Sequence, residues 1–234
     1  MLRVPQDAII AGVRVLDEAT ARYVTRVHRL NTGDVFLAFD PVHALEAEAE
    51  IVSTNGPVHV RLSGPVACTN LPRRRVTVIQ TASKGSKIED VLRDATELGV
   101  TRFVVAVGQR SIKRPEASQT SRWVRVSIEA ARQCGRGDVP ELAGPMPLAQ
   151  ALAEPGDVRW IMEPRGVHVR VAAASATKGA TVLVIGPEGG FAPEELELAE
   201  RLGYLRVSLG SFVLRTETAC AAALGAIAAL TDAG

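Results

Sequence analysis

The hydrophobic and polar positions of this chain follow two different patterns, one before residue 70 and one after residue 75. In the first part, short apolar runs, two of them alternating with polar residues, are separated by turns containing Asn, Gly and Pro, which is typical of β-strands. The pattern favours a compact barrel over a helical unit. We expect strands at residues 35–39, 47–52 and 58–62, and a basic helix at residues 18–30.

After residue 75, apolar runs that fit buried strands alternate with amphipathic stretches that fit helices, which predicts an α/β domain with a largely parallel sheet. A capping-box pair, Ser86 with Glu89, marks the start of the first helix. The last helix, residues 217–230, is almost entirely Ala, Leu, Ile and Gly, so it must be buried in the sheet or against a second subunit of a homodimer. The expected strands are residues 76–81, 103–107, 159–162, 182–185 and 205–209, and a further helix is expected at residues 121–133.

The polar, basic stretch between the two patterns, CTNLPRRR at residues 68–75, marks a domain boundary. We therefore expect an N-terminal domain at residues 1–70 and a C-terminal domain at residues 75–234. With 47% hydrophobic residues, the 234-residue chain can build real cores. It does not open on a basic segment followed by a long apolar run, and it has no apolar stretch of membrane-spanning length, so no membrane association is expected.

Charge and cysteine content narrow the classes of function. The 27 basic and 26 acidic side chains leave a net charge of +1, so nucleic-acid binding would depend on local basic patches. Cys68, Cys134 and Cys220 are far apart, and the histidines have no metal-ligand spacing, so we expect no disulfide, no metal site and a cytoplasmic location. The motifs of nicotinamide-binding domains, P-loop proteins, esterases and zinc proteases do not occur in the sequence.

The stretch VLVIGPEGGFAP, residues 182–193, is the strongest candidate for a binding site. Its strand runs into a loop with little side-chain bulk and then into a helix with Pro193 in the first turn. In open α/β sheets, ligands lie in crevices beyond the carboxyl ends of the strands. Residues 159–165 and 209–218 also run from a strand into a turn, so we expect three strand ends to converge on one crevice.

The charged residues of these turns allow a structural and a functional interpretation. Arg215 fits a salt bridge to Glu217 or Glu188, and it fits equally well a functional cation beside the crevice. Basic clusters at residues 84–87 and 110–114 follow strands of the same sheet. They should make this edge of the sheet positive, as binding to phosphates requires.

Ordered motifs spread along nearly the whole chain indicate a family. They are Arg29-Leu30 with Gly33-Asp34, Lys84-Gly85 with ATELGV at residues 95–100, Arg110-Ser111, Glu129-Ala130-Ala131 with Gln133, Arg136, Val139 and Pro140, GPEGGF at residues 186–191, and Leu209-Gly210 with LRTETA at residues 214–219. On these motifs the chain resembles the bacterial 16S rRNA (uracil-N(3))-methyltransferases of the RsmE type, within the SPOUT class of S-adenosylmethionine-dependent enzymes. Tyr23, Ser211 and Cys134 depart from the family pattern, mostly on the side that would meet RNA.

The resemblance implies a small N-terminal PUA-like β-barrel that helps to hold RNA, and a SPOUT domain whose C-terminal end is threaded into a trefoil knot. It also implies a homodimer, 16S rRNA or the small ribosomal subunit as partner, and S-adenosylmethionine bound in the knot. The cofactor-binding residues that it implies are Met162, Glu163, Ile185, Gly186, Pro187, Glu188, Gly189, Gly190, Leu209, Gly210, Val213, Leu214, Arg215 and Thr216.

Methylation of uracil N(3) requires that this nitrogen lose its proton, so the site must accept the proton or stabilise the resulting anion. We expect Arg215 and backbone N–H groups of the glycine loop to supply electrostatic stabilisation, and Glu217 or Glu188 to accept the proton or to pair with Arg215. A same-fold methyltransferase for another RNA or base atom and a non-catalytic RNA-binding assembly factor remain alternatives. The target would be an extruded uridine, and the expected phosphate contacts are Arg29, Lys84, Arg110, Lys113, Arg114 and Arg136.

Overall fold

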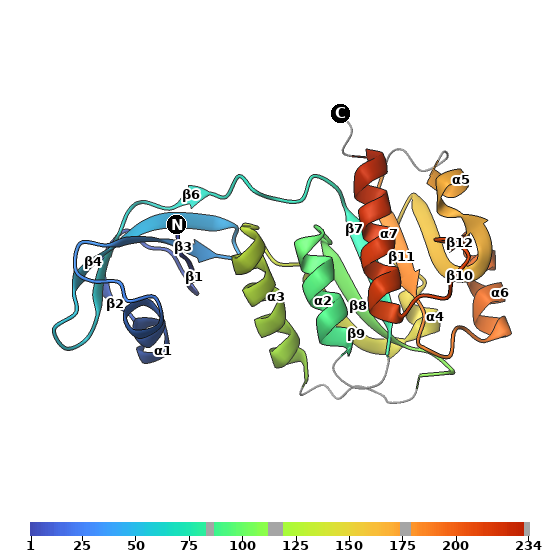
Figure 1. Cartoon of the computed structure of the whole chain (residues 1–234), viewed down its shortest axis with the longest axis horizontal. Helices are drawn as coiled ribbons and strands as arrows, with labels where there is room; N and C mark the ends of the chain where they lie inside the picture. The colour runs from blue at the N-terminus through green and yellow to red at the C-terminus, as the bar shows by residue number, and fades with distance from the viewer. Residues whose placement is uncertain (83–86, 112–118, 174–178, 232–234) are drawn as a thin grey trace. The chain divides into compact units, whose positions relative to one another are not determined.

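The computed structural model describes residues 1–82, 87–111, 119–173 and 179–231 (Figure 1). The chain forms two compact units. Unit 1 consists of Met1–Leu71 and Ala131–Val139, and unit 2 of Pro72–Ala130 and Pro140–Gly234. Helix α3 (Thr120–Cys134) therefore begins in unit 2 and ends in unit 1.

Unit 1 is built on a six-stranded sheet in the order β1-β3-β4-β5-β2, with β6 paired to β4. β1 pairs with β3 in parallel, and the other pairings are antiparallel. Phe36, Ile51 and Val60 are fully buried in its core, which confirms the apolar run that predicted β3 and the alternating runs that predicted β4 and β5. The strands are β1 (Arg3–Pro5), β2 (Gly12–Val15), β3 (Val35–Asp40), β4 (Leu45–Ser53), β5 (His59–Leu62) and β6 (Val66–Ala67).

The helix expected at residues 18–30 is shorter and less regular than the sequence predicted. Helix α1 (Glu18–Arg22) continues as a π-helix, η1 (Tyr23–Val27), in which the His28 N–H donates to the Tyr23 carbonyl at 3.1 Å. Arg29 then adopts a left-handed conformation with φ of 57°, which ends the helix before residue 30. Wide turns of this kind are frequent at functional sites.

Unit 2 is an α/β domain with six parallel strands in the order β12-β10-β11-β7-β8-β9. The five expected strands are confirmed, whereas β9 was missed. It contains Gly144-Pro145, which argue against a strand, but its place at the edge of the sheet and a register shift against β8 accommodate the proline. The strands are β7 (Val76–Thr81), β8 (Arg102–Val107), β9 (Glu141–Pro147), β10 (Val158–His168), β11 (Thr181–Ile185) and β12 (Leu205–Ser208).

Helices cover both faces of this sheet. On one face α2 and α7 lie side by side, as Figure 1 shows, and their apolar residues form one cluster with α5 and the sheet. On the other face α4 and α6 pack over Ile79 and Val184. Within the described residues, none of the helices combines the length and apolar character needed to cross a membrane. The helices are α2 (Lys87–Glu97), α4 (Leu148–Ala151), α5 (Val169–Ala173), α6 (Pro193–Arg201) and α7 (Thr216–Thr231).

The helix starts agree with the sequence where they can be compared. α6 begins at Pro193 and α7 at Thr216, both as the pattern predicted to within a residue. The capping residue proposed for α2, Ser86, lies outside the described residues. β12, β10 and β11 are neighbours in the parallel sheet, so their carboxyl ends meet at one edge. The candidate site lies at this edge.

Candidate functional site

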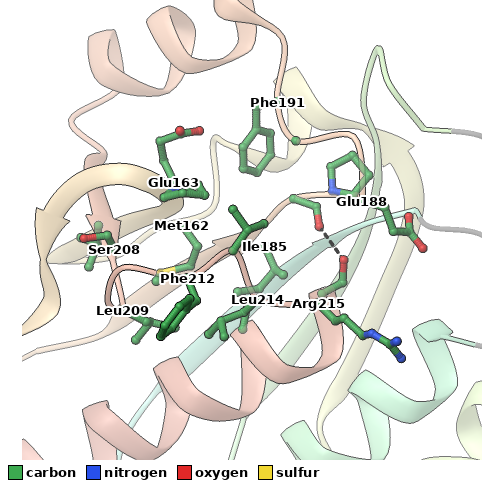
Figure 2. A pocket seen from close by; sticks show the side chains of 18 of the residues that line it. Met162, Glu163, Ile185, Glu188, Phe191, Ser208, Leu209, Phe212, Leu214 and Arg215 are labelled. Carbon is green, nitrogen blue, oxygen red and sulfur yellow. Dashed lines mark hydrogen bonds between the residues drawn. The ribbon is translucent and has the colours of Figure 1, made fainter.

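A cavity of about 340 Å³ opens at the carboxyl ends of β10, β11 and β12, in front of the start of α7 (Figure 2). Its walls come from three segments that are distant in sequence, and most of the side chains are apolar. The lining residues are Met162, Glu163, Pro164, Ile185, Gly186, Pro187, Glu188, Gly190, Phe191, Val207, Ser208, Leu209, Gly210, Phe212, Val213, Leu214, Arg215, Thr216 and Ala219.

The glycine loop after β11, residues 186–191, is held in place by its own packing. The Thr81 hydroxyl, fully buried in β7, donates to the carbonyl of Ile185 at 2.8 Å and fixes the end of the strand. A turn closes where the Gly190 N–H donates to the Pro187 carbonyl at 2.9 Å. A Cβ on Gly186 would come within 3.0 Å of the Phe191 ring, so the ring packs against bare backbone.

The turn inside β10 forms a second wall of the cavity. A Cβ on Gly166 would lie 2.5 Å from the backbone of Arg206 in β12, so only glycine allows this close approach. The Ser208 hydroxyl donates to the Gly166 carbonyl at 3.0 Å. These contacts hold Glu163 on the cavity wall with a side chain 11% exposed, 3.5 Å from the Arg165 guanidinium.

The N-terminus of α7 closes the cavity on a third side. The Thr216 hydroxyl donates to the Gly186 carbonyl at 3.2 Å, the dashed line in Figure 2. The helix therefore directs its positive end toward the glycine loop. Before it, Phe212 and Val213 line the cavity with side chains that are 85% and 81% exposed.

The cavity brings together all of the expected cofactor-binding residues except Gly189. The carbonyl of Gly189 instead accepts a hydrogen bond of 3.0 Å from the Arg110 guanidinium. Sequence reasoning passed over several lining residues inside or next to the motifs that it used. Phe191 and Ala219 stand within those motifs, whereas the apolar pattern could not distinguish the others from core or turn residues. The missed residues are Pro164, Phe191, Val207, Ser208, Phe212 and Ala219.

Of the two expected catalytic residues, only Arg215 lies on the cavity wall. Arg215 lines the cavity and is exposed, and in Figure 2 its guanidinium leads away from Met162 and Leu209. Within the described residues, no ion pair joins Arg215 to Glu217. Glu217 is not among the residues that line the cavity, and its Oε2 atom is buried with no hydrogen-bond partner in the described part of the chain.

Glu217 instead influences a carboxyl group on α2. Burial raises the pKa of Asp94, the nearby Arg93 opposes this shift, and Asp90 and Glu217 raise the pKa further. α2 and α7 therefore bring carboxyl groups into electrostatic contact next to the start of α7. Among the described residues, no group of three His, Cys, Asp or Glu side chains could hold a metal ion.

The expected phosphate contacts fall in different surroundings. Arg29 in unit 1 and Arg110 in unit 2 are exposed. Arg136 is 5% exposed, and its Nε lies 2.6 Å from Asp138 Oδ1. Its guanidinium could meet a phosphate only by leaving this buried pair, so we do not retain it as an RNA contact. Outside the described residues lie Lys84, Lys113 and Arg114.

Comparison with known proteins agrees with this geometry. The model of the RNA methyltransferase domain matches residues 69–228, so the chain belongs to the RNA methyltransferase family. It is 31% identical over 242 residues to the ribosomal RNA small subunit methyltransferase E of Synechocystis sp., covering 99% of this chain and 78% of the relative. It is also 31% identical over 232 residues to the protein of the same name from Mycobacterium bovis, covering 94% and 88%.

A solved structure extends the similarity to three dimensions. The crystal structure of a ribosomal RNA small subunit methyltransferase E from Neisseria gonorrhoeae, bound to S-adenosyl methionine, matches with a TM-score of 0.88. The two chains are 27% identical, and the match covers 100% of each. The resemblance seen in the sequence motifs is thereby confirmed over the full length.

Proposed function

We propose that the protein is an S-adenosylmethionine-dependent methyltransferase that modifies N(3) of a uridine in 16S rRNA of the small ribosomal subunit. One observation carries the proposal. Residues of GPEGG and of LRTETA, which are distant in sequence, line one cavity, and the chain matches a cofactor-bound relative over its whole length.

The cavity fits S-adenosylmethionine in size and chemistry. A volume of about 340 Å³ lies in the range of small-molecule sites. Ile185, Phe191 and Leu209 offer apolar surface to the adenine, and the loops around them present backbone N–H and C=O groups. We assign the ribose hydroxyls to Glu163, because a carboxylate on a largely apolar wall is a strong hydrogen-bond acceptor for them.

The mechanism that we propose depends on charge at the mouth of the cavity. The bound cofactor supplies a methyl group on a sulfonium; its carbon–sulfur bond breaks, leaving the electron pair on sulfur, as the N(3) lone pair bonds the carbon. Glu188, which lines the cavity, accepts the N(3) proton, and Arg215 and the positive end of α7 stabilise the imide anion that results. Of the two expected catalytic residues, we retain Arg215 in this role, since Glu217 does not line the cavity.

A transfer assay tests the function. Purified protein and labelled S-adenosylmethionine are incubated with small ribosomal subunits that lack the modification, and the RNA is digested to nucleosides for mass spectrometry. We expect 3-methyluridine. Label in another nucleoside would overturn the base assignment, and cofactor binding without transfer to any RNA would favour an assembly factor.

The RNA contacts form a separate part of the proposal. Arg29 and Arg110 are exposed cations, and Arg110 keeps further N–H groups beyond the one that binds Gly189. Lys84, Lys113 and Arg114 remain predictions from the sequence. Because phosphate contacts release counterions, the affinity for RNA should fall steeply as the salt concentration rises. In a plot of log affinity against log salt concentration, each lost contact should reduce the slope by about one.

We also propose the finer fold that the resemblance implies, a PUA-like barrel in unit 1 and a trefoil knot at the C-terminal end of unit 2. The mainly antiparallel sheet of unit 1 is consistent with the barrel. In unit 2, the bond from Thr216 to Gly186 joins the loops that would form the knot. The full-length match to the Neisseria structure supports both assignments.

A homodimer is the assembly that we propose. The surface of α7 that does not face its own sheet carries small residues, among them Ala222, Gly225 and Ala229. Small side chains allow two helices to approach closely. Light scattering after size-exclusion chromatography measures the mass directly, and a mass near the 24.8 kDa of one chain would contradict the dimer.

A further inference from the structure

Glu195, in the first turn of α6, uses both of its carboxylate oxygens on backbone groups. Oε2 accepts from the N–H of Ala192 at 2.8 Å, which is the returning half of a capping box. Oε1 accepts from the N–H of Gln109 at 2.7 Å, which belongs to the loop after β8. Its side chain is buried, at 8% exposure, so these two bonds replace the water that a carboxylate would otherwise bind.

The loop after β8 returns to the glycine loop through a second contact. Next to Gln109, the Arg110 guanidinium donates to the Gly189 carbonyl at 3.0 Å. The loop after β8 is thus joined at two points, to the glycine loop at Gly189 and to the start of α6, directly after the glycine loop, at Glu195. Loops joined in this way have fewer conformations than either loop alone, so bonds that would be weak singly restrict both loops together.

The absence of a side chain at Gly108 leaves space for the Glu195 carboxylate. Its φ does not lie in the left-handed region, so its backbone conformation would accept any residue. A Cβ at this position would, however, lie 2.6 Å from Glu195 Oε1. The glycine is therefore explained by the close approach of Glu195.

We propose that Glu195 is a positioning residue for the cofactor loop. By holding Ala192 and Gln109, it keeps residues 186–191 in the conformation that binds S-adenosylmethionine and places Arg110 against Gly189. Glu195 does not line the cavity, so it acts through the loop and not on the cofactor itself. The inference rests on the proposed function in that it takes the glycine loop to be the cofactor site.

Two variants change the carboxylate in different ways. Glu195→Gln keeps the shape of the side chain but replaces one acceptor oxygen by an amide donor. Gly108→Ala leaves Glu195 charged and pushes its flexible end off the Gln109 N–H. The matched control is Glu194→Gln, a carboxylate of the same helical turn that is exposed. Melting temperatures identify any variant that has lost its fold.

Calorimetry with S-adenosylmethionine, steady-state kinetics and hydrogen exchange measured by mass spectrometry then give the result. We expect both variants to weaken cofactor binding by roughly tenfold, since hydrogen bonds to a charged group are lost. KM for the cofactor should rise with kcat little changed at saturation. Peptides covering residues 186–192 and 108–111 should exchange faster together, while Glu194→Gln behaves as the wild type.

Unchanged cofactor affinity in both folded variants, or faster exchange in only one of the two loops, would overturn the proposal. Failure of the proposed function gives a different result. If the wild type binds the cofactor but methylates no RNA, binding and exchange still decide the role of Glu195. If the wild type does not bind the cofactor, the positioning of a cofactor loop is overturned with it, even where exchange shows that the two loops are coupled.

Discussion

The hydroxyl of Thr216, at the start of α7, donates a hydrogen bond of 3.2 Å to the carbonyl oxygen of Gly186. The two residues belong to LRTETA and GPEGG, so the bond joins the two motifs that indicated the family. Thr216 is 5% exposed, which shields the bond from water. The last helix and the glycine loop are therefore held together directly at the cavity, where the cofactor is proposed to bind.

Replacing Thr216 by valine tests this bond without changing the shape of the side chain. Loss of one hydrogen bond costs about 1 kcal/mol, so the Kd for S-adenosylmethionine should rise by roughly fivefold in a calorimetric titration. Thr218→Val is the control, because Thr218 is exposed on the same helix. Equal affinities for the two variants would show that the bond does not hold the cofactor loop.

The sequence was sufficient to place this site because its signals are local. An apolar strand that ends in GPEGG and a proline that starts a helix can be recognised without knowing the fold, and parallel topology then requires neighbouring strand ends to meet. The loops at residues 186–190 and 209–216 were found in this way.

Other features depend on partners that are distant in sequence, and here the sequence was not sufficient. Arg136 looked like a surface cation, but its burial beside Asp138 is a consequence of tertiary packing. The edge position that allows proline in β9 is a property of the assembled sheet. The contact from Glu195 to Gln109 joins residues 86 positions apart, and no periodic pattern indicates it.

Arg215 and Glu217 should differ in their effect on turnover. Arg215→Ala removes the cation beside the reacting base and should lower kcat by about 100-fold or more. Glu217→Gln should lower kcat by less than about tenfold, because Glu217 does not line the cavity. Single-turnover methyl transfer to small ribosomal subunits measures both.

Arg201→Ala is the control for this comparison, since Arg201 is exposed at the end of α6. If Glu217→Gln were as slow as Arg215→Ala at every pH, the proposed division of roles would be contradicted and Glu217 would return as the proton acceptor. If Arg215→Ala left kcat unchanged in a folded protein, its stabilising role would be excluded.

Asp94 should make stability depend on pH. Burial raises its pKa above the ordinary value of 3.8, Arg93 opposes the shift, and Asp90 and Glu217 add to it. The folded protein then binds this proton more tightly than the unfolded chain, so ionisation of Asp94 costs stability. The cost is absent below about pH 3.8 and is complete once the pH exceeds the raised pKa.

Asp94→Asn removes the charge and should raise Tm at neutral pH by a few degrees at most. This gain in Tm should disappear as the pH falls below 3.8, the ordinary pKa of the group. Asp90→Asn is the contrast, because the Asp90 side chain is 51% exposed and pairs with Arg93 at 3.0 Å, so removing its charge should change Tm little. Thermal unfolding as a function of pH measures both. A gain for Asp94→Asn that persists at low pH would contradict the electrostatic explanation.

Gly225 distinguishes the stability of one chain from the stability of a dimer. It lies within α7, and among the described residues a Cβ there would meet nothing within 4 Å beyond the backbone of its own helix. Alanine is favoured over glycine inside a helix by about 0.5–1 kcal/mol, so Gly225→Ala should stabilise an isolated chain. If α7 packs against a second copy, the added methyl group enters the interface and should weaken the dimer.

We therefore expect Gly225→Ala to shift the equilibrium toward monomer in light scattering at low concentration, while the monomer that forms unfolds at a higher temperature. Gly64→Ala is the control, since Gly64 also has open space around the missing Cβ but belongs to unit 1. A more stable protein with an unchanged dimer would place the interface away from this part of α7. A variant less stable even as a monomer would contradict the open space that the structure assigns to Gly225.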